Sequence, residues 1–359
     1  MRDKFRTWLR LLIVVIPLLG FLIFVNCFFD PANIFHNVSR PIADSLLSGK
    51  ATFITSGNMN ERLVKQYFIE DMPEQTECIT VGPSTIFGIR SEHVGTKSYY
   101  NLGVSGADFY DVVAQFALLD INEKKVDRVI FCMDNYFFNE SLYGSFTRNA
   151  PWKPYAEYMM GTLDGKSMQI PKRDTKAERI EQFRQLFSIT YFQSCIDYIK
   201  TNGSLKIARW GEAKEQYEGA YYLPDGSMIY AKDYRENTTV SDVTNAANGY
   251  DMDYQFTPYA YCNARSMEYF EKLIVYLQEQ GTEVDLFLCP LCPTLWDRYD
   301  EERYPILPQI EAFAHEMADK YGLDVIGSYN PYELGISDED FHDARHIKHD
   351  RLEAFFDFK

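Results

Sequence analysis

Short, continuous apolar runs alternate with helical patterns in this sequence, and few folds accommodate that alternation. The runs CITVG, SYYNLG, RVIFCMD, VDLFLCP and LDVIGS occupy residues 78–82, 98–103, 128–134, 284–290 and 323–328. Apolar residues at helical spacing fill 107–122, 264–281 and 309–322, and the last two stretches end in glycine. Strands that are apolar on both faces are typical of parallel sheets covered by helices. The sequence therefore predicts a three-layer α/β domain with a parallel sheet of about five strands.

The stretch 140–260 interrupts this alternation. It is polar and rich in tyrosine, and 222–234 predicts a hairpin around Asp225-Gly226. We interpret it as an insertion after the third strand, at the sheet edge where α/β proteins place binding loops. A lid, an acceptor-binding surface and a purely structural cap all fit this position. The predicted organisation is a flank and membrane segment at 1–29, a linker with a leading helix at 30–75, and the α/β domain at 76–359.

The N-terminus indicates a membrane segment. The first ten residues, MRDKFRTWLR, are basic, and residues 11–29 contain no charged side chain. Nineteen helical residues span roughly 28 Å, close to the hydrocarbon thickness of a bilayer. Basic flanks stay cytoplasmic, so the rest of the chain is expected on the extracytoplasmic side of a single-pass signal anchor. A cleaved signal peptide is disfavoured, because the apolar run is long and no small-x-small site follows it.

Charge and cysteine content exclude some functions. The formal net charge of −16 makes nucleic acid an unfavourable partner. The chain has seven cysteines, and two of them form the CxxC of CPLCP at 289–293. No second CxxC completes a zinc ribbon, so a strand end or a local disulfide explains this motif better than redox or metal chemistry.

Candidate catalytic residues follow the predicted strands. Ser84 comes just after the first strand, Gly103 and Gly106 follow the second, Asp134 and Asn135 end the third, and Asp343 precedes His346 by three residues near the C-terminus. Reactive groups of open α/β sheets gather at the carboxyl ends of the strands. On a helical turn, residues three apart share a face, so Asp343 is expected to orient His346 as a base toward Ser84. The sequence thus predicts a Ser-His-Asp triad.

An oxyanion pocket is expected beside this triad. Its expected donors are the backbone N–H groups of Ser84 and Gly106 and the side chain of Asn135. Several residues of the site also fit ordinary structural roles, since Ser84 fits a helix N-cap and Asp134 fits a loop cap. The histidines at 342, 346 and 349 would share one side of a helix and fit a zinc site. Outside that site, His342 and His349 are expected to be exposed polar residues.

The order of these blocks resembles the SGNH (GDSL-like) hydrolase superfamily. The likeness covers about 76–135 and 284–350 and rests on Ser84, on Gly106 within GVSGAD, on MDN, and on Asp343 with His346. The serine block is Gly-Pro-Ser instead of Gly-Asp-Ser, and in one register Asp134 takes the position of the family's asparagine. The N-terminal anchor, YYNLGVSGA and FHDARH look like the membrane-anchored, DltD-like branch that accompanies membrane-bound O-acyltransferases. The resemblance implies a flavodoxin-like fold, no cofactor and no metal.

Three functional hypotheses follow. The resemblance implies an acyltransferase or esterase that acts on a cell-surface polysaccharide or teichoic acid, beside a membrane-bound O-acyltransferase. A catalytically inactive scaffold of the same fold is the alternative, motivated by the two unusual blocks. A metal-dependent hydrolase built on the C-terminal histidines is the third.

Overall fold

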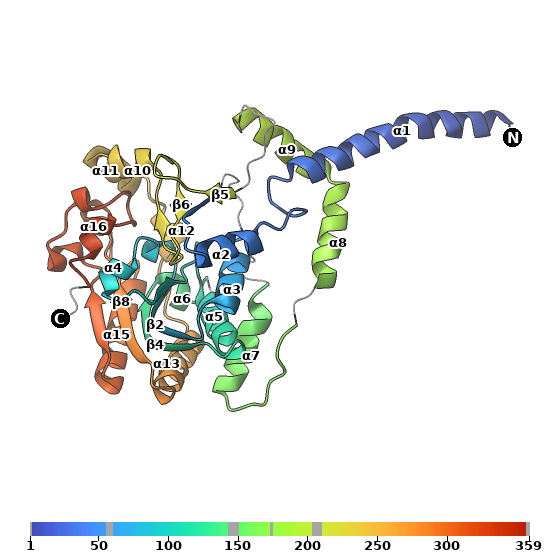
Figure 1. The fold of residues 1–359 in the computed structure, drawn as a ribbon. Coiled ribbons are helices and arrows are strands. Elements are labelled where there is room, and N and C mark those ends of the chain that lie inside the picture. Colours follow the sequence, from blue (N-terminus) through green and yellow to red (C-terminus); the bar gives the residue numbers. More distant parts are fainter. Residues whose placement is uncertain (1, 55–59, 143–150, 173–174, 203–209, 357–359) are drawn as a thin grey trace. The chain divides into compact units, whose positions relative to one another are not determined.

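The computed structural model of the protein describes residues 2–54, 60–142, 151–172, 175–202 and 210–356 (Figure 1). The side chains of residues 2–11, 175–178, 181 and 202 lie outside this description, and with them the basic side chains of the N-terminal flank. The chain divides into two compact units. The first comprises Met1–Ile42, Ile54–Asn60 and Lys172–Gly211, and the second comprises Ala43–Phe53, Glu61–Pro171 and Glu212–Lys359. The stretch 140–260 therefore contributes to both units.

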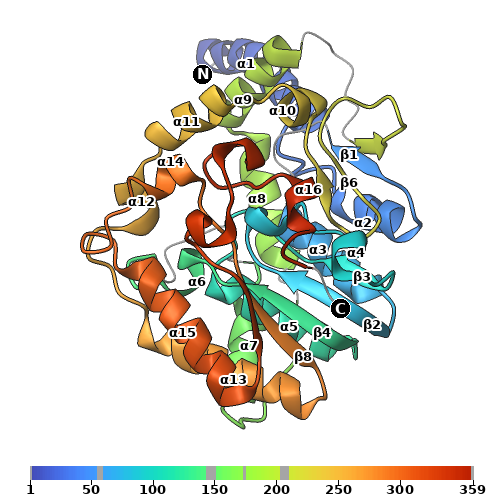
Figure 2. The same ribbon diagram turned by 90° about the vertical axis from the view of Figure 1, so that its left-hand side faces the viewer.

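The second unit contains a five-stranded parallel sheet, which confirms the predicted α/β class. Its strand order is β3-β2-β4-β8-β9, and every neighbouring pair is parallel. The strands are β2 (Gln75–Val81), β3 (Tyr99–Asn101), β4 (Lys125–Cys132), β8 (Glu283–Leu288) and β9 (Asp324–Gly327). The last four residues of β2 and of β4 are all buried, as expected for strands covered on both faces. Figure 2 shows β2, β4 and β8 side by side.

Aromatic contacts identify what covers each face of this sheet. On one face, Phe131 of β4 packs against Phe116 of α5 (Phe109–Ile121) and Phe270 of α13 (Ala264–Glu279). On the other face, Phe287 of β8 packs against the C-terminal Phe356. The sheet therefore packs against other parts of the unit on both of its faces.

Local signals in the sequence explain where the helices begin and end. The Asp108 side chain caps the start of α5, and the Asn263 side chain caps the start of α13. α15 (Ile306–Tyr321) ends at Gly322, whose φ of 68° is the left-handed conformation that glycine tolerates. The predicted helices at 107–122, 264–281 and 309–322 are thus present with slightly different bounds.

Two smaller predictions, a hairpin and a leading helix, both agree with the structure. The hairpin around Asp225-Gly226 is confirmed, since β6 (Tyr221–Tyr222) and β7 (Met228–Ile229) pair antiparallel. The leading helix expected within 30–75 is present as α3 (Glu61–Asp71), and the short strand β1 (Thr52–Ile54) precedes it.

The remaining described elements are short, apart from the helices α1, α7, α8 and α9. They are α1 (Arg2–Phe29), α2 (Ser39–Leu47), η1 (Ser84–Ile86), α4 (Ser91–Val94), α6 (Asn135–Phe138), α7 (Lys153–Leu163), α8 (Thr175–Leu186), α9 (Ile189–Asn202), β5 (Trp210–Glu212), α10 (Lys232–Glu236), α11 (Val240–Asn248), α12 (Met252–Phe256), α14 (Pro293–Trp296), η2 (Pro331–Leu334), η3 (Asp338–Asp340) and α16 (His349–Leu352).

α1 belongs to the first unit. Among the described residues, its segment Leu12–Phe29 is long and apolar enough to cross a membrane. This agrees with the predicted N-terminal apolar span. Its neighbours within the first unit are α8 and α9, which both pack against it.

Candidate active site

Ser84 stands on a turn that requires glycine. β2 ends at Val81, and Gly82 then adopts a φ of 154°. A Cβ atom on Gly82 would lie 2.6 Å from the Cβ atom of Cys132 in β4, so only glycine lets the two strands approach this closely. Pro83 follows, and Ser84 begins the short helix η1. The chain thus places Ser84 at the carboxyl edge of the sheet.

The side chains of Ser84, His346 and Asp343 form one chain of hydrogen bonds. The Ser84 Oγ atom lies 3.0 Å from His346 Nε2, although 262 residues separate the two in sequence. The other ring nitrogen, Nδ1, lies 2.8 Å from Asp343 Oδ2. Because an ionised carboxylate only accepts, the imidazole carries its proton on Nδ1, and Nε2 is left to accept from the serine hydroxyl. The three predicted residues therefore have the geometry of a nucleophile, a base and an orienting acid.

The segment that carries Asp343 and His346 is a tight loop and not the expected helical turn. Phe341 and Ile347 form an isolated antiparallel bridge that closes the loop, and the His342 N–H donates to the His346 carbonyl at 2.7 Å. Within the loop, Asp343 Oδ1 accepts the backbone N–H of His346 at 2.8 Å. The carboxylate thus caps its own turn, a local hydrogen-bonding pattern that aspartate favours. Three-residue spacing places the two side chains together here without a helix.

A tyrosine from the inserted region completes the surroundings of Asp343. The Tyr234 hydroxyl donates to Asp343 Oδ2 at 2.6 Å. Burial raises the pKa of Asp343, but its hydrogen bond to His346, the charge of His346 and the bond from Tyr234 outweigh this effect and hold the pKa well below its usual range. The carboxylate is therefore ionised at neutral pH. Nothing in the sequence singled out Tyr234 among the many tyrosines of 140–260.

Asp134 is held by a buried ion pair. Its carboxylate accepts from Arg345 Nη2 at 2.7 Å and from the backbone N–H of Tyr136 at 3.1 Å, so it also caps α6. Burial lowers the pKa of Arg345, but the neighbouring Tyr250 and Asp134 outweigh it and keep that pKa well above its usual value. Arg345 stays charged and neutralises Asp134. The loop-cap interpretation of Asp134 agrees with this geometry.

Asn135 does not line the pocket beside Ser84. Its side-chain amide donates to the Gln255 carbonyl at 2.6 Å. Its Oδ1 atom is buried and has no hydrogen-bond partner within the described residues. The amide that was expected to face an oxyanion is thus engaged elsewhere, because α6 turns it toward the inserted region.

Gly106 lies in the loop between β3 and α5, where its φ of 54° is left-handed. This loop is fastened to α3, since Glu61 accepts the backbone N–H of Ser105 at 2.6 Å and its hydroxyl at 2.9 Å. Gly106 does not line the Ser84 pocket. The loop that carries Gly106 is therefore held in place by Glu61, but Gly106 is not part of the pocket wall.

The pocket beside the triad has a volume of about 260 Å³. Arg345 and Asp134 contribute charge to it, and Tyr136 contributes an aromatic wall. The inserted region supplies part of the lining as well. The full set of lining residues is Pro83, Ser84, Thr85, Asp134, Tyr136, Ala246, Tyr250, Gln255, Asp343, Ala344, Arg345 and His346. The prediction that the insertion borders the site therefore agrees with the structure.

His342 is buried and not exposed as expected. Its ring stacks on Tyr234, with ring centres 5.1 Å apart, and only 6% of the residue is exposed. Burial lowers its pKa to about 4. His349 is half-buried at the start of α16, so the three C-terminal histidines do not lie on one helix. No group of three or more His, Cys, Asp or Glu residues in the described ranges is placed to hold a metal ion. Cys289 and Cys292 are both buried and unbridged.

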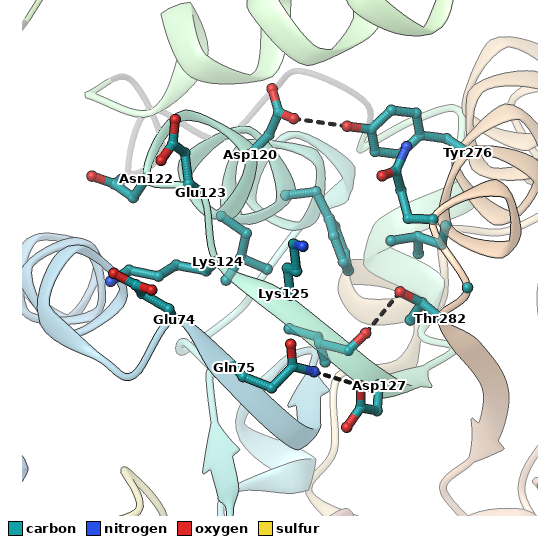
Figure 3. A pocket seen from close by; sticks show the side chains of 16 residues that line it. Glu74, Gln75, Asp120, Asn122, Glu123, Lys124, Lys125, Asp127, Tyr276 and Thr282 are labelled. Carbon is teal, nitrogen blue, oxygen red and sulfur yellow. Dashed lines mark hydrogen bonds between the residues drawn. The ribbon is translucent and has the colours of Figure 1, made fainter.

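A larger cleft of about 890 Å³ opens at the opposite edge of the sheet (Figure 3). Its wall includes Gln75 and Lys125, which begin β2 and β4. Several of its polar groups bond to one another, as the Asp120 carboxylate does with the Tyr276 hydroxyl at 2.8 Å. Ligands of open α/β sheets bind at the carboxyl ends of the strands, which favours the smaller pocket as the functional one.

No protein-family model matches the chain, and comparison with curated proteins finds no significant match.

Proposed function

We propose that this protein is a membrane-anchored, extracytoplasmic serine acyltransferase or esterase of the SGNH type. The observation that carries the proposal is the continuous hydrogen-bond chain from Ser84 through His346 to Asp343. Its support is geometric, because a nucleophile, a base and an acid are recognised by their mutual positions and not by their spacing in sequence. The parallel sheet with Ser84 at its carboxyl edge supports the flavodoxin-like arrangement that the SGNH resemblance implies.

The proposed reaction proceeds through an acyl-enzyme. Ser84 Oγ attacks the carbonyl carbon of an acyl ester while its proton passes to His346 Nε2. Asp343 holds the imidazole by Nδ1 and stabilises the imidazolium that forms. His346 then gives the proton to the departing alcohol, and the acyl group stays on Ser84. A hydroxyl of a second alcohol, or water, reverses these steps and releases the acyl group.

Arg345 is the proposed source of positive charge at the reacting carbonyl. The side-chain amide typical of SGNH sites does not serve this role here, because Asn135 is engaged with Gln255. Arg345 lines the same pocket as Ser84 and is fixed there by Asp134 and Tyr250. A preorganised charge in a site with little water stabilises a developing oxyanion without reorganising. We assign Arg345 that part together with the backbone N–H groups at the start of η1.

The proposed acyl group is small. A pocket of about 260 Å³ lies below the roughly 300–1,000 Å³ of pockets that enclose drug-sized ligands. A pocket of this volume matches a short acyl group. The apolar α1 segment and the likeness to the DltD-like branch support our proposal that the acceptor is a cell-surface polysaccharide or teichoic acid, with a membrane-bound O-acyltransferase as the proposed partner.

The test is covalent labelling of the full chain with a fluorophosphonate probe. We expect labelling of the native chain, none of Ser84→Ala, and full labelling of Ser91→Ala, a serine substitution outside the pocket. Adding a short-chain ester with or without a polysaccharide acceptor then separates transfer, which consumes acceptor hydroxyls, from hydrolysis, which yields free acid alone.

The inactive scaffold is the second candidate, and the position of Asn135 favours it. In that case the folded native chain shows no more labelling than Ser84→Ala, although its thermal unfolding remains cooperative. Such a result contradicts the proposed enzyme and leaves the fold as a binding partner.

A further inference from the structure

We propose that α8 is an interfacial membrane helix, whose exposed apolar stripe enters the outer leaflet beside the membrane-spanning segment of α1. The stripe consists of Ile180 and Phe183 of α8 and of Phe187, the residue that follows the end of the helix at Leu186. These side chains are 54%, 63% and 40% exposed. Exposed groups of large apolar side chains mark contact surfaces, and the bilayer is the occupant that the following contacts favour.

The stripe occupies one side of the helix. At about 100° per residue, positions 180 and 183 lie roughly 60° apart on α8, and Phe187 follows directly after the helix. The Phe183 and Phe187 rings are in edge contact, with centres 5.3 Å apart, so they form one aromatic surface. Arg184 is exposed beside this surface. A cationic side chain beside an apolar surface keeps its charge in the headgroup region while its stem lies along the apolar surface.

Asn26 of α1 fixes the depth of α8. Its side-chain amide is fully buried and donates to the carbonyls of Gln185, Leu186 and Ser188 at 2.9, 3.1 and 3.0 Å. The last carbonyls of a helix have no hydrogen-bond donor within the helix. At the end of α8, Asn26 of the apolar α1 segment provides that donor. Asn26 precedes the end of α1 at Phe29 by three residues, or about 4.5 Å along the helix axis. The end of α8 therefore lies at the depth where the apolar segment ends.

The orientation of α8 follows from its contacts beyond the end of α1. Gln182 Nε2 donates to the Ile34 carbonyl at 2.9 Å, and Ile34 belongs to the segment that leaves α1 on its non-membrane side. Helical periodicity puts Gln182 about 160° from Ile180 and about 100° from Phe183, so it lies on a different side of α8 from the stripe. The stripe therefore faces back toward the membrane. Figures 1 and 2 agree that α8 runs across the end of α1 and not along it, as a helix lying flat on a bilayer would.

α9 holds this arrangement in place. Tyr191 donates to Asp30 Oδ1 at 2.6 Å and accepts the backbone N–H of Ala32 at 3.2 Å. Val25 and Phe29 of α1 pack with Tyr191 and Cys195 in a small buried core. The turn between α8 and α9 is thus fastened to the last turns of α1 by both polar and apolar contacts, and the stripe has a fixed position relative to the membrane-spanning segment.

The test places spin labels on the full chain in vesicles of phosphatidylcholine and phosphatidylglycerol, mixed three parts to one. Cys27 and Cys262, the cysteines that are not buried, are first replaced by alanine. Labels are then attached at Phe183→Cys, at Phe187→Cys and, as the matched control, at Asp197→Cys, an exposed position of α9. Because all three positions are exposed, the labels leave the packing of the unit intact.

We expect the labels at 183 and 187 to collide several-fold more often with oxygen, which concentrates in lipid, than with a water-soluble nickel chelate. The label at 197 should show the reverse preference. Equal access of the chelate to 183, 187 and 197 would overturn the proposal. Protection of 183 and 187 from both reagents, present only at high protein-to-lipid ratio, would also overturn it, since a second copy of the chain would then be the occupant. Neither readout depends on catalytic activity.

Discussion

Replacing His342 by phenylalanine should make the protein more resistant to acid. The folded state keeps His342 uncharged down to about pH 4, whereas an ordinary histidine takes up its proton near pH 6.5. Between these values the unfolded chain binds more protons at this position than the folded chain does. Stability therefore falls as the pH drops from 6.5 toward 4, and it is unaffected by His342 at higher pH.

The magnitude follows from these two pKa values. At pH 5 the lowered pKa of His342 decreases the free energy of unfolding by about 2 kcal/mol, and at pH 7 by only about 0.2 kcal/mol. Phenylalanine keeps the stacking on Tyr234 and carries no titrating group. It also removes His342 Nδ1, a buried atom without a hydrogen-bond partner in the described part of the chain. A difference of about 2 kcal/mol corresponds to roughly 4–8 °C in melting temperature for a unit of this size.

The assay is thermal unfolding of the full chain in detergent at pH 7 and pH 5. The native chain should lose several degrees more than His342→Phe between the two conditions. His315→Gln, a change at an exposed histidine of α15, should behave like the native chain. If the native chain and His342→Phe lose the same number of degrees, the burial of an uncharged His342 is refuted.

Three further outcomes are expected. Tyr234→Phe removes one hydrogen bond to the triad carboxylate and should lower ester turnover roughly tenfold with little change in KM; unchanged turnover would show that the hydroxyl has no positioning role. Arg345→Met leaves Asp134 buried without its partner and should cost about 3–5 kcal/mol of unfolding free energy, and the added change Asp134→Asn should restore much of it in urea titrations. Gly82→Ala forces a Cβ atom against Cys132 and should lower the melting temperature, whereas Gly95→Ala, at a φ of 72° with open space around it, should cost less.

The sheet was predictable because its strands are unbroken apolar runs in the sequence. The last four residues of β2 and of β4 and the last five of β8 are buried, and apart from Thr80 and Asp285 these residues are apolar. The proximity of Ser84 and His346 was predictable for a related reason. Parallel strands bring their carboxyl ends to one edge, so residues that follow different strands meet there whatever their distance in sequence.

The surroundings of the triad were not predictable in the same way. Tyr234 and Tyr250 reach the site from an inserted region without periodicity, and no local pattern distinguishes them from its other tyrosines. His342 is covered by Tyr234, which lies more than a hundred residues away in the sequence. The residues next to His342 in the sequence therefore gave no sign that it would be buried. The Asp343-x-x-His346 spacing is compatible with a helical turn and with a capped loop, and only the bridge between flanking residues decides for the loop.

The loop 341–347 makes the acid and the base a single mechanical part. Asp343 is bonded to the backbone of His346 as well as to its ring, and the loop closes on itself through its own main chain. The hydrogen bond to Asp343 therefore keeps the imidazole proton on Nδ1, whatever the position of Ser84. The remaining geometric requirement of the triad is the distance between Ser84 Oγ and His346 Nε2. A change elsewhere in the sheet that shifts the carboxyl end of β2 is therefore expected to change this distance.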